Sequence, residues 1–227
     1  MTLQHVDILF QLIVFLFAIS VHESAHAWMA NRCGDPTARM LGRITLNPIK
    51  HIDMFGTVLL PLLCVIAHIP VLGWAKPTPV DPRNFRNPVK DDILTAVVGP
   101  ISNFLVASVA TIVLIIVKLT SASGSQIVSG ITFGMVSLES NSPLVPLSLL
   151  IYELLVINVV LAVFNLIPVP PLDGSHVLRH FLPDQVRRVF DAVGWFGLLA
   201  LVYFGGDILG RLLHPFLSFF NYILLRA

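Results

Sequence analysis

The chain has 227 residues, of which 56% are hydrophobic and 12% are charged, and its formal net charge at pH 7 is +1. Soluble domains carry a charged fraction of about 25%, so this composition excludes an ordinary soluble domain. A net charge so close to zero gives no indication of a nucleic-acid partner. The sequence instead predicts an all-α polytopic membrane protein that lies in a lipid bilayer.

Runs of apolar residues predict helices that cross the bilayer, because ~20 residues of α-helix span a hydrocarbon core of about 30 Å. With a further apolar segment at 55–72, we expect four to six transmembrane helices. The Ser- and Gly-rich residues 121–130 are expected to form a loop. The predicted helices lie near 6–30, 92–118, 144–167 and 191–212, with a weaker helical stretch at 212–225.

Lysine and arginine are distributed unevenly over the connecting segments. Of the 14, four lie in 31–53, four in 76–90 and three in 179–188, whereas 119–143 has none. By the positive-inside rule, the three basic segments are predicted to be cytoplasmic and 119–143 to be external. This places the N-terminus outside.

The apolar segment 55–72 lies between two segments that are both predicted to be cytoplasmic. It therefore cannot cross the membrane once, and we expect a re-entrant segment that turns near Pro61. Irregular backbone at membrane depth is tolerated only against protein or a water-filled cavity. A cavity beside the first helix is therefore expected.

The cytoplasmic connections also predict extended structure. Over 39–47, Ile44 and Leu46 alternate with polar residues, which predicts a small cytoplasmic-side β element. Residues 74–88 contain four prolines, so they are expected to be extended or looped and not helical.

The first predicted helix contains the motif H-E-x-x-H at His22, Glu23 and His26. Residues i and i+4 lie on one helical face, so both imidazoles can bind one ion, and Glu23 can reach a water on that ion. Two imidazoles and one carboxylate leave a position open for water, which is the pattern of catalytic zinc. Ionisable groups at the end of an apolar transmembrane run are functional by default; the alternative is a helix end that has reached the interface.

The motif needs a third protein ligand, for which Asp173 is the best candidate. Asp173 follows the helix-breaking stretch 168–171 at the same cytoplasmic end as the motif, whereas Glu153 lies toward the external half. His176 is an alternative ligand, because His176 and His180 are also four residues apart; Asp173 would then support it. We favour placing both histidines at the membrane interface, on a short cytoplasmic helix.

Several motifs together resemble the site-2 protease family of intramembrane zinc metalloproteases, in a compact form without a PDZ or paired CBS domain. In that family the aspartate before the glycine is the third zinc ligand, which implies this role for Asp173. The resemblance covers about 20–180. It implies one membrane-embedded peptidase domain over 1–227, with its catalytic core at about 5–180 and C-terminal helices at about 186–225. The motifs are H-E-x-x-H, Asn165 with Pro168-Val-Pro-Pro-Leu-Asp-Gly174, Gly99-Pro-Ile-Ser-Asn103, Gly42-Arg-Ile-Thr-Leu-Asn-Pro48 and Trp74-Ala-Lys-Pro-Thr-Pro-Val80.

The resemblance implies a zinc metalloendopeptidase with one Zn²⁺ per chain and Glu23 as its general base. The expected substrate is a membrane protein that is cut within or near a transmembrane segment, in regulated intramembrane proteolysis. The expected location is a prokaryotic plasma membrane, with the active site toward the cytoplasm. Asn103 and Asn165 are candidates for holding substrate backbone, and Ile44 and Leu46 for a strand edge that an extended substrate joins. The alternative is a membrane protein that binds or transports metal without proteolysis.

Overall fold

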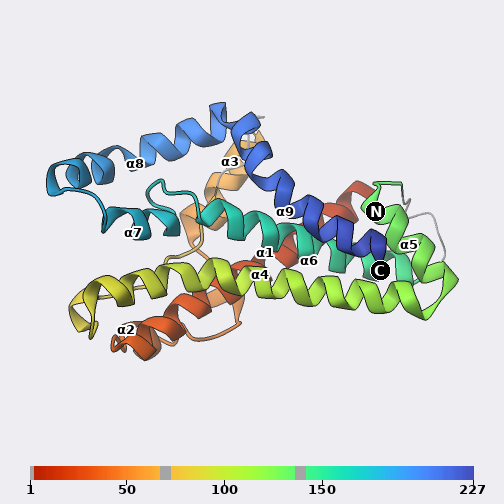
Figure 1. Cartoon of the computed structure of the whole chain (residues 1–227), viewed down its shortest axis with the longest axis horizontal. Helices are drawn as coiled ribbons and strands as arrows, with labels where there is room; N and C mark the ends of the chain where they lie inside the picture. The colour runs from red at the N-terminus through yellow and green to blue at the C-terminus, as the bar shows by residue number, and fades with distance from the viewer. Residues whose placement is uncertain (1–2, 67–72, 136–141) are drawn as a thin grey trace. The chain divides into compact units, whose positions relative to one another are not determined.

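The computed structural model describes residues 3–66, 73–135 and 142–227, and within these ranges every regular element is a helix. The predicted all-α class is therefore confirmed. Four helices are long and apolar enough to cross a membrane, judged by length and composition. They are α1 (Leu3–Cys33), α4 (Pro88–Thr120), α6 (Leu144–Asn165) and α9 (Gly206–Arg226), labelled with the others in Figure 1.

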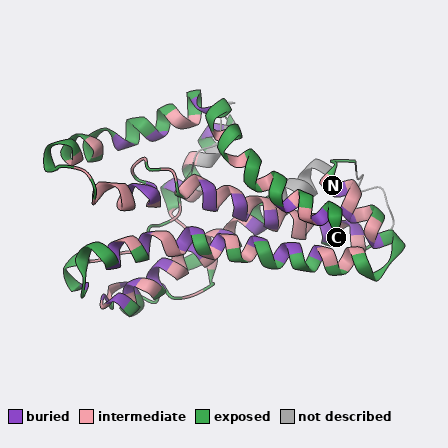
Figure 2. Ribbon diagram, in the orientation of Figure 1, coloured by how far each residue is buried: buried purple, intermediate pink, exposed green. Residues whose placement is uncertain are grey.

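The C-terminal region differs from the prediction of one helix over 191–212. α8 covers Asp184–Phe204, α9 begins at Gly206, and the helix breaks between them at Gly205. Two successive glycines favour this break, because glycine costs about 1 kcal/mol relative to alanine in a helix interior. α8 is not one of the four candidate spans, and Figure 2 shows that much of its surface is exposed.

Shorter helices occupy the connections between the long ones. Residues 121–130, which we expected to form a loop, belong to α5 (Ala122–Thr132). Ser121 caps this helix, because its Oγ accepts a hydrogen bond from the N–H of Gly124 at 2.9 Å. The others are α2 (Thr37–Met40), the 3₁₀-helices η1 (Pro48–Lys50) and η3 (Pro82–Asn84), the π-helical η2 (Met54–Leu59), α3 (Leu60–Ile66) and α7 (Asp173–Arg179).

Residues 39–47 form no strand, so the predicted β element is wrong. The chain turns at Gly42, whose φ of +67° lies in the left-handed region that favours glycine. The side chain that points inward after the turn is Arg43, which is 6% exposed, whereas Ile44 and Leu46 are 39% and 57% exposed. The alternating pattern predicted that Ile44 and Leu46 lie inside, but the buried residue is the charged Arg43.

The apolar segment 55–72 is helical in the part that the structure describes. Pro61 is the second residue of α3, which continues directly from η2, so the chain is helical at Pro61 and does not turn there as we expected. Residues 67–72 lie outside the described residues. The N–H of Trp74 donates to the carbonyl oxygen of Gly56 at 3.1 Å, so Trp74, which follows the segment, lies beside its start. The re-entrant path through a membrane stays a prediction.

Packing groups the chain into two compact units, each assembled from separate segments. Unit 1 comprises 1–18, 103–161 and 210–227, and unit 2 comprises 19–102 and 162–209. This grouping does not test whether the chain folds as a single domain, so the single domain stays a prediction.

Unit 1 contains polar contacts between apolar helices. Asn103 on α4 is fully buried and donates from Nδ2 to Oδ1 of Asn158 on α6 at 2.7 Å. α9 runs alongside α6 (Figure 1), and Tyr152 on α6 donates from its hydroxyl to Oδ1 of Asn221 on α9 at 3.1 Å. Such bonds between apolar helices stabilise their packing by about 1 kcal/mol each.

Unit 2 contains an extended segment, residues 74–81, which we call the strap. It has no regular structure, as its prolines predicted. The N–H of Lys76 donates to the carbonyl oxygen of His51 at 2.8 Å. The guanidinium of Arg43 donates to the carbonyl oxygen of Pro77 at 3.5 Å. These bonds hold the strap in place although it belongs to no helix or sheet.

The far end of the strap is tied to Asp35, whose side chain is fully buried. Its Oδ2 accepts a hydrogen bond from the N–H of Asp81 at 2.8 Å. Its Oδ1 accepts from the hydroxyl of Thr37 at 2.5 Å and from the amide of Asn84 at 2.9 Å. Burial alone would raise the pKa of Asp35, but these hydrogen bonds together hold the pKa below its ordinary range. Asp35 is therefore ionised at neutral pH and anchors the strap beside the end of α1.

Candidate metal centre

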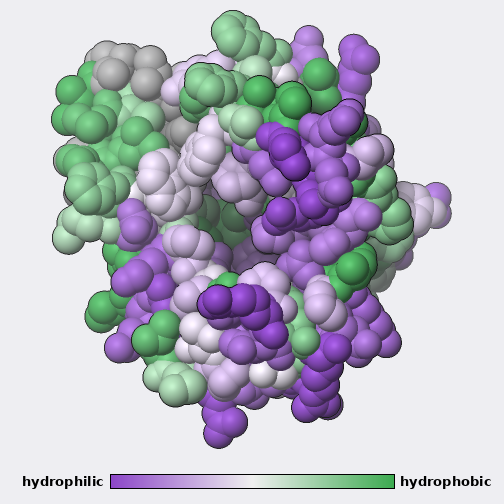
Figure 3. Space-filling view, turned by 90° about the vertical axis from the view of Figure 1, so that its left-hand side faces the viewer, coloured by the Kyte–Doolittle hydropathy of each residue, from purple (hydrophilic) through white to green (hydrophobic). Residues whose placement is uncertain are grey.

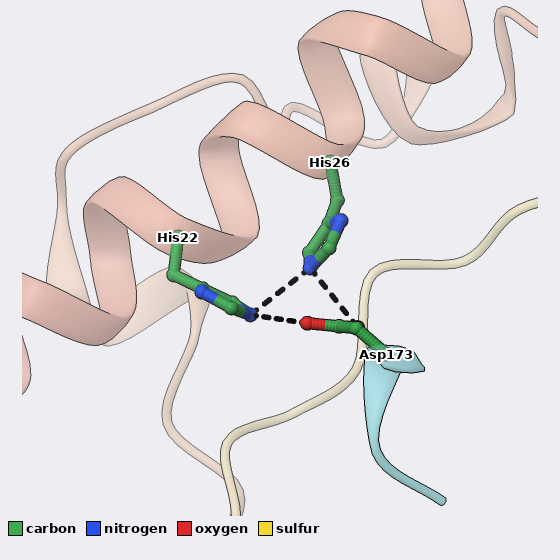
Figure 4. A group of neighbouring side chains, drawn as sticks. All are labelled: His22, His26 and Asp173. Atoms are coloured by element: carbon green, nitrogen blue, oxygen red, sulfur yellow. Dashed lines mark hydrogen bonds and ion pairs between the residues drawn. The ribbon is translucent and has the colours of Figure 1, made fainter. Parts of the chain in front are cut away.

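Three side chains of unit 2 converge on one point, two from α1 and one from the start of α7. His22 and His26 are four residues apart, so their rings project from one face of the helix. Figure 4 shows both rings pointing at the carboxylate of Asp173. The two Nε2 atoms are 3.0 Å apart. Oδ2 of Asp173 lies 3.1 Å from Nε2 of His22, and Oδ1 lies 3.4 Å from Nε2 of His26.

A carbonyl group fixes the orientation of the second histidine. Nδ1 of His26 lies 2.7 Å from the carbonyl oxygen of Thr95 on α4. A carbonyl oxygen can only accept, so Nδ1 carries a proton, and in the neutral form that binds a metal Nε2 would present its lone pair. Metal-binding histidines are oriented by partners of this kind. The sequence contained no signal for Thr95, because its contribution is a backbone atom.

The carboxylate of Asp173 is only partly satisfied by the protein. Its Oδ2 is buried and has no hydrogen-bond partner of proper geometry among the described residues. Burial alone would raise the pKa of Asp173, but the imidazoles of His26 and His22 hold it below its ordinary range, so the carboxylate is ionised. A bound metal ion would supply the partner that this buried oxygen lacks.

The three side chains are placed to hold a zinc ion. Atoms that bind zinc at 2.0–2.2 Å are about 3.3 Å from one another in a tetrahedron. The two Nε2 atoms are 3.0 Å apart, and each of them has a different oxygen of Asp173 at 3.1 or 3.4 Å. Two imidazoles and one carboxylate are also the ligand set of several catalytic zinc sites. Among the described residues, one group of His, Cys, Asp or Glu side chains is placed so that it could hold a metal ion, and it consists of His22, His26 and Asp173.

Gly99 on α4 makes room for the two imidazoles. A Cβ at this position would lie 2.4 Å from Nε2 of His26 and 2.7 Å from Cε1 of His22. Both distances are far below van der Waals contact, so any side chain here would displace the ligand atoms. The geometry therefore gives a physical reason for the glycine of the Gly99-Pro100 motif.

The loop before α7 brings Asp173 to the histidines. α6 ends at Asn165, and the irregular residues 166–172 include a cis peptide bond between Pro170 and Pro171. Gly174 allows a close approach, because a Cβ there would lie 2.2 Å from the carbonyl oxygen of Leu166. Asp173 is the first residue of α7.

Glu23, the predicted general base, lies beside the first histidine and contacts the strap. Its Oε2 accepts a hydrogen bond from the N–H of Thr78 at 2.9 Å and from the hydroxyl of Thr78 at 2.7 Å. Thr78 is not among the site residues predicted from the sequence. Its only signal was its place in the Trp74–Val80 motif.

His176 and His180 contact a different carboxylate. Nε2 of His180 lies 2.7 Å from Oδ2 of Asp92, and Nδ1 of His176 lies 3.5 Å from Oδ1 of the same residue. The structure thus pairs Asp173 with the H-E-x-x-H histidines, and it pairs His176 on α7 and His180 just after α7 with Asp92. This arrangement favours Asp173 over His176 as the third ligand.

The residues expected to touch substrate are dispersed. Asn103 is fully buried and hydrogen-bonded within unit 1. Asn165 is half-buried at the end of α6 in unit 2. Ile44 and Leu46 are exposed but lie on no strand. Their assignment to substrate contact stays a prediction.

The face of the molecule that carries α2, α7 and the start of α4 is hollowed at its centre (Figure 3). Hydrophilic residues surround the hollow, and apolar residues are visible inside it. Hydrophilic residues therefore form the rim of a recess on this face.

A helical membrane protein with an H-E-x-x-H centre completed by an aspartate is the class that this fold and site define. Over residues 10–203 the chain matches the model of peptidase family M50. It therefore belongs to this family, the site-2 proteases, and the resemblance drawn from the sequence is confirmed.

Two curated proteins are similar to the chain along most of its length. "Putative zinc metalloprotease YwhC" of Bacillus subtilis strain 168 is 33% identical over 207 residues, which cover 91% of this chain and 84% of that protein. "Putative zinc metalloprotease Rip2" of Mycolicibacterium smegmatis is 26% identical over 194 residues, which cover 83% of this chain and 63% of that protein. No solved structure matches the chain.

Proposed function

We propose that the protein is an intramembrane zinc metalloendopeptidase that binds one zinc ion per chain through His22, His26 and Asp173, with Glu23 as its general base. The observation that carries this proposal is the convergence of the three ligand atoms within 4.8 Å of one another, with Glu23 next to the first ligand. Family membership and the names of the two relatives support both the metal and the reaction.

The zinc ion, when bound, would act as a Lewis acid toward the scissile carbonyl and lower the pKa of a water molecule. The carboxylate of Glu23 accepts the proton of the attacking water. Oε1 is the atom suited to this step, because Oε2 already accepts two hydrogen bonds from Thr78. Glu23 then donates the proton to the nitrogen of the leaving amine, so the peptide bond is replaced by a carboxylate and an amine.

The proposed substrate is a membrane protein that is cut within or near a transmembrane segment, as in regulated intramembrane proteolysis. The apolar α1, which carries two of the three proposed ligands, supports this substrate class. A helical segment hides its carbonyl groups in its own hydrogen bonds, so it must unwind locally before attack. The hydrophilic residues around the recess in Figure 3 support the access of water to this face.

The proposed location is a prokaryotic plasma membrane, with the metal centre toward the cytoplasm. The two curated relatives come from bacteria. The positive-inside rule supports the cytoplasmic side, because the basic segments 31–53 and 76–90 follow and precede the helices of the centre.

The function can be tested with purified wild type and Glu23→Gln in lipid nanodiscs. We expect about one zinc per chain in both proteins by elemental analysis. Wild type should cut labelled single-span peptides whose apolar core contains a helix-destabilising Gly-Pro pair, and should cut all-leucine cores far more slowly. Glu23→Gln should reduce cleavage by at least ~10²-fold, because a general base contributes typically 10²–10⁴-fold.

Two other outcomes would contradict the proposal. Stoichiometric zinc without cleavage by wild type would indicate a metal-binding or metal-transport protein. Absence of zinc from wild type purified without chelators would show that the H-E-x-x-H group is not a metal centre.

A further inference from the structure

Thr78 contacts Glu23 through two donors, one from its backbone and one from its side chain. The N–H and the hydroxyl both reach Oε2, at 2.9 and 2.7 Å, and the hydroxyl also lies 3.0 Å from the carbonyl oxygen of Glu23. These residues are 55 positions apart in the sequence. Oε1 has no hydrogen-bond partner in the parts of the chain that the structure describes. One oxygen of the carboxylate is thus held while the other is left for chemistry.

The strap presents Thr78 in a fixed position. Pro77 and Pro79 flank it, and proline restricts the backbone on both sides because its φ is locked near −65°. Neighbouring points of the strap are tied to unit 2 by the bond from Arg43 to Pro77 and the bond from Lys76 to His51. A donor on such a segment loses little conformational freedom when it binds a carboxylate.

We propose that Thr78 is a positioning residue of the peptidase reaction, whose hydroxyl orients the Glu23 carboxylate so that Oε1 faces the attacking water. The inference rests on the proposed function, since it assigns no reaction of its own to Thr78. The hydroxyl remains a donor to Oε2 before and after Oε1 accepts the proton. Thr78 therefore needs to gain or lose no proton during the cycle.

The contacts of Thr78 determine which kinetic effect is expected when its hydroxyl is removed. It contacts the general base and none of the three metal ligands, so its loss should leave zinc content unchanged. A carboxylate that samples several rotamers is in the reactive geometry for a smaller fraction of the time, and small misplacements of reacting groups can cost up to 10²-fold in rate. The loss should appear in kcat, whereas KM should change by less than about twofold.

The test uses three variants of the full chain in nanodiscs, with the Gly-Pro peptide as substrate. Thr78→Val removes the hydroxyl, keeps the shape and keeps the N–H, and should lower kcat about tenfold. Thr78→Ser restores the hydroxyl and should recover most of the wild-type kcat. Thr57→Val is the matched control, because Thr57 donates from its hydroxyl to the strap carbonyl of Trp74 at 2.8 Å, away from Glu23. This control should retain the wild-type kcat and KM.

Several results would overturn the inference. The first is a Thr78→Val enzyme as active as wild type. The second is a Thr78→Val enzyme more active than wild type, which would make the strap inhibitory. The third is an equal loss of kcat in Thr57→Val, which would reduce the effect to a loosened strap. Thr78→Ala serves as the second hydroxyl-free variant if Thr78→Val does not fold. The proposed function fails separately, if wild type itself cuts no peptide.

Discussion

At the scale of single residues, the metal centre depends on which carboxylate and which imidazole face one another. Asp173 and His176 are three residues apart on α7, yet Asp173 lies against His22 and His176 lies against Asp92. The short helix is thus held at its start by the metal centre and further along by a carboxylate of α4. Removing a metal ligand and removing a residue that only supports α7 should therefore have different effects on zinc binding.

We expect Asp173→Ala to lose stoichiometric zinc, because it removes a ligand and leaves the two imidazoles without the ionised partner. His176→Ala should bind zinc within about tenfold of the wild-type affinity, the lower end of the range for residues that support ligands indirectly. Competition with a chromogenic chelator measures both. Asp191→Ala is the control, since Asp191 on α8 contacts Arg179 at 3.4 Å and not the centre. The opposite ranking would make His176 the third ligand.

At the scale of elements, α4 supplies the centre with a space and a carbonyl group. Gly99 leaves the space that the imidazoles fill, and one turn earlier Thr95 accepts a hydrogen bond from His26. The strap supplies Thr78 to Glu23. Both contributions come from segments outside the H-E-x-x-H motif. α4, the strap and the start of α7 thus complete the environment of the motif on α1.

Gly99→Ala tests the contribution of α4. Alanine is favoured over glycine in a helix by about 1 kcal/mol, so a site with free space would be stabilised. Here the methyl group would overlap Nε2 of His26, and overpacking costs typically 1–3 kcal/mol. We therefore expect zinc affinity to fall at least tenfold and the unfolding temperature of the zinc-bound protein to drop.

The matched control is Gly210→Ala on α9, where a Cβ would have no heavy atom within 4 Å. It should retain zinc and unfold at the same or a higher temperature. Unchanged zinc affinity in Gly99→Ala would contradict the steric role assigned to Gly99.

At the scale of the whole molecule, four candidate spans and the distribution of basic residues predict one topology. With α1, α4, α6 and α9 as spans, both termini are external, and the segments that contain the strap and α7 are cytoplasmic. α8 is then a cytoplasmic element and not a fifth span. In this predicted topology, which itself uses the positive-inside rule, the candidate metal centre lies on the cytoplasmic side.

Single introduced cysteines test this topology. Arg83→Cys, at a position whose side chain is 89% exposed, should react with a membrane-impermeant thiol reagent in inverted vesicles and not in intact cells. Ser123→Cys, at an exposed position near the start of α5, should show the reverse pattern. The unsubstituted chain is the control, because Cys33 and Cys64 are buried. Labelling of both positions from the same side would exclude the predicted topology.

The sequence alone determined the helical class and three of the four candidate spans, and it singled out the residues of the candidate metal centre. The physical reason is that these features are local. A span depends on the apolar length of one segment, and two ligands four residues apart share a helical face whatever surrounds them. Asp173 was reached in the same way, through prolines that end a helix at the predicted cytoplasmic end.

The tertiary structure decided the features that depend on contacts between distant segments. The bond from His26 to Thr95 joins residues 69 positions apart, and the bond from Thr78 to Glu23 joins residues 55 apart. The predicted strand at 39–47 failed for a related reason, since Arg43 finds acceptors in another segment and is buried in place of its apolar neighbours. Whether a polar side chain lies inside is decided by the partner that it meets, and the partner is specified only once the chain has folded.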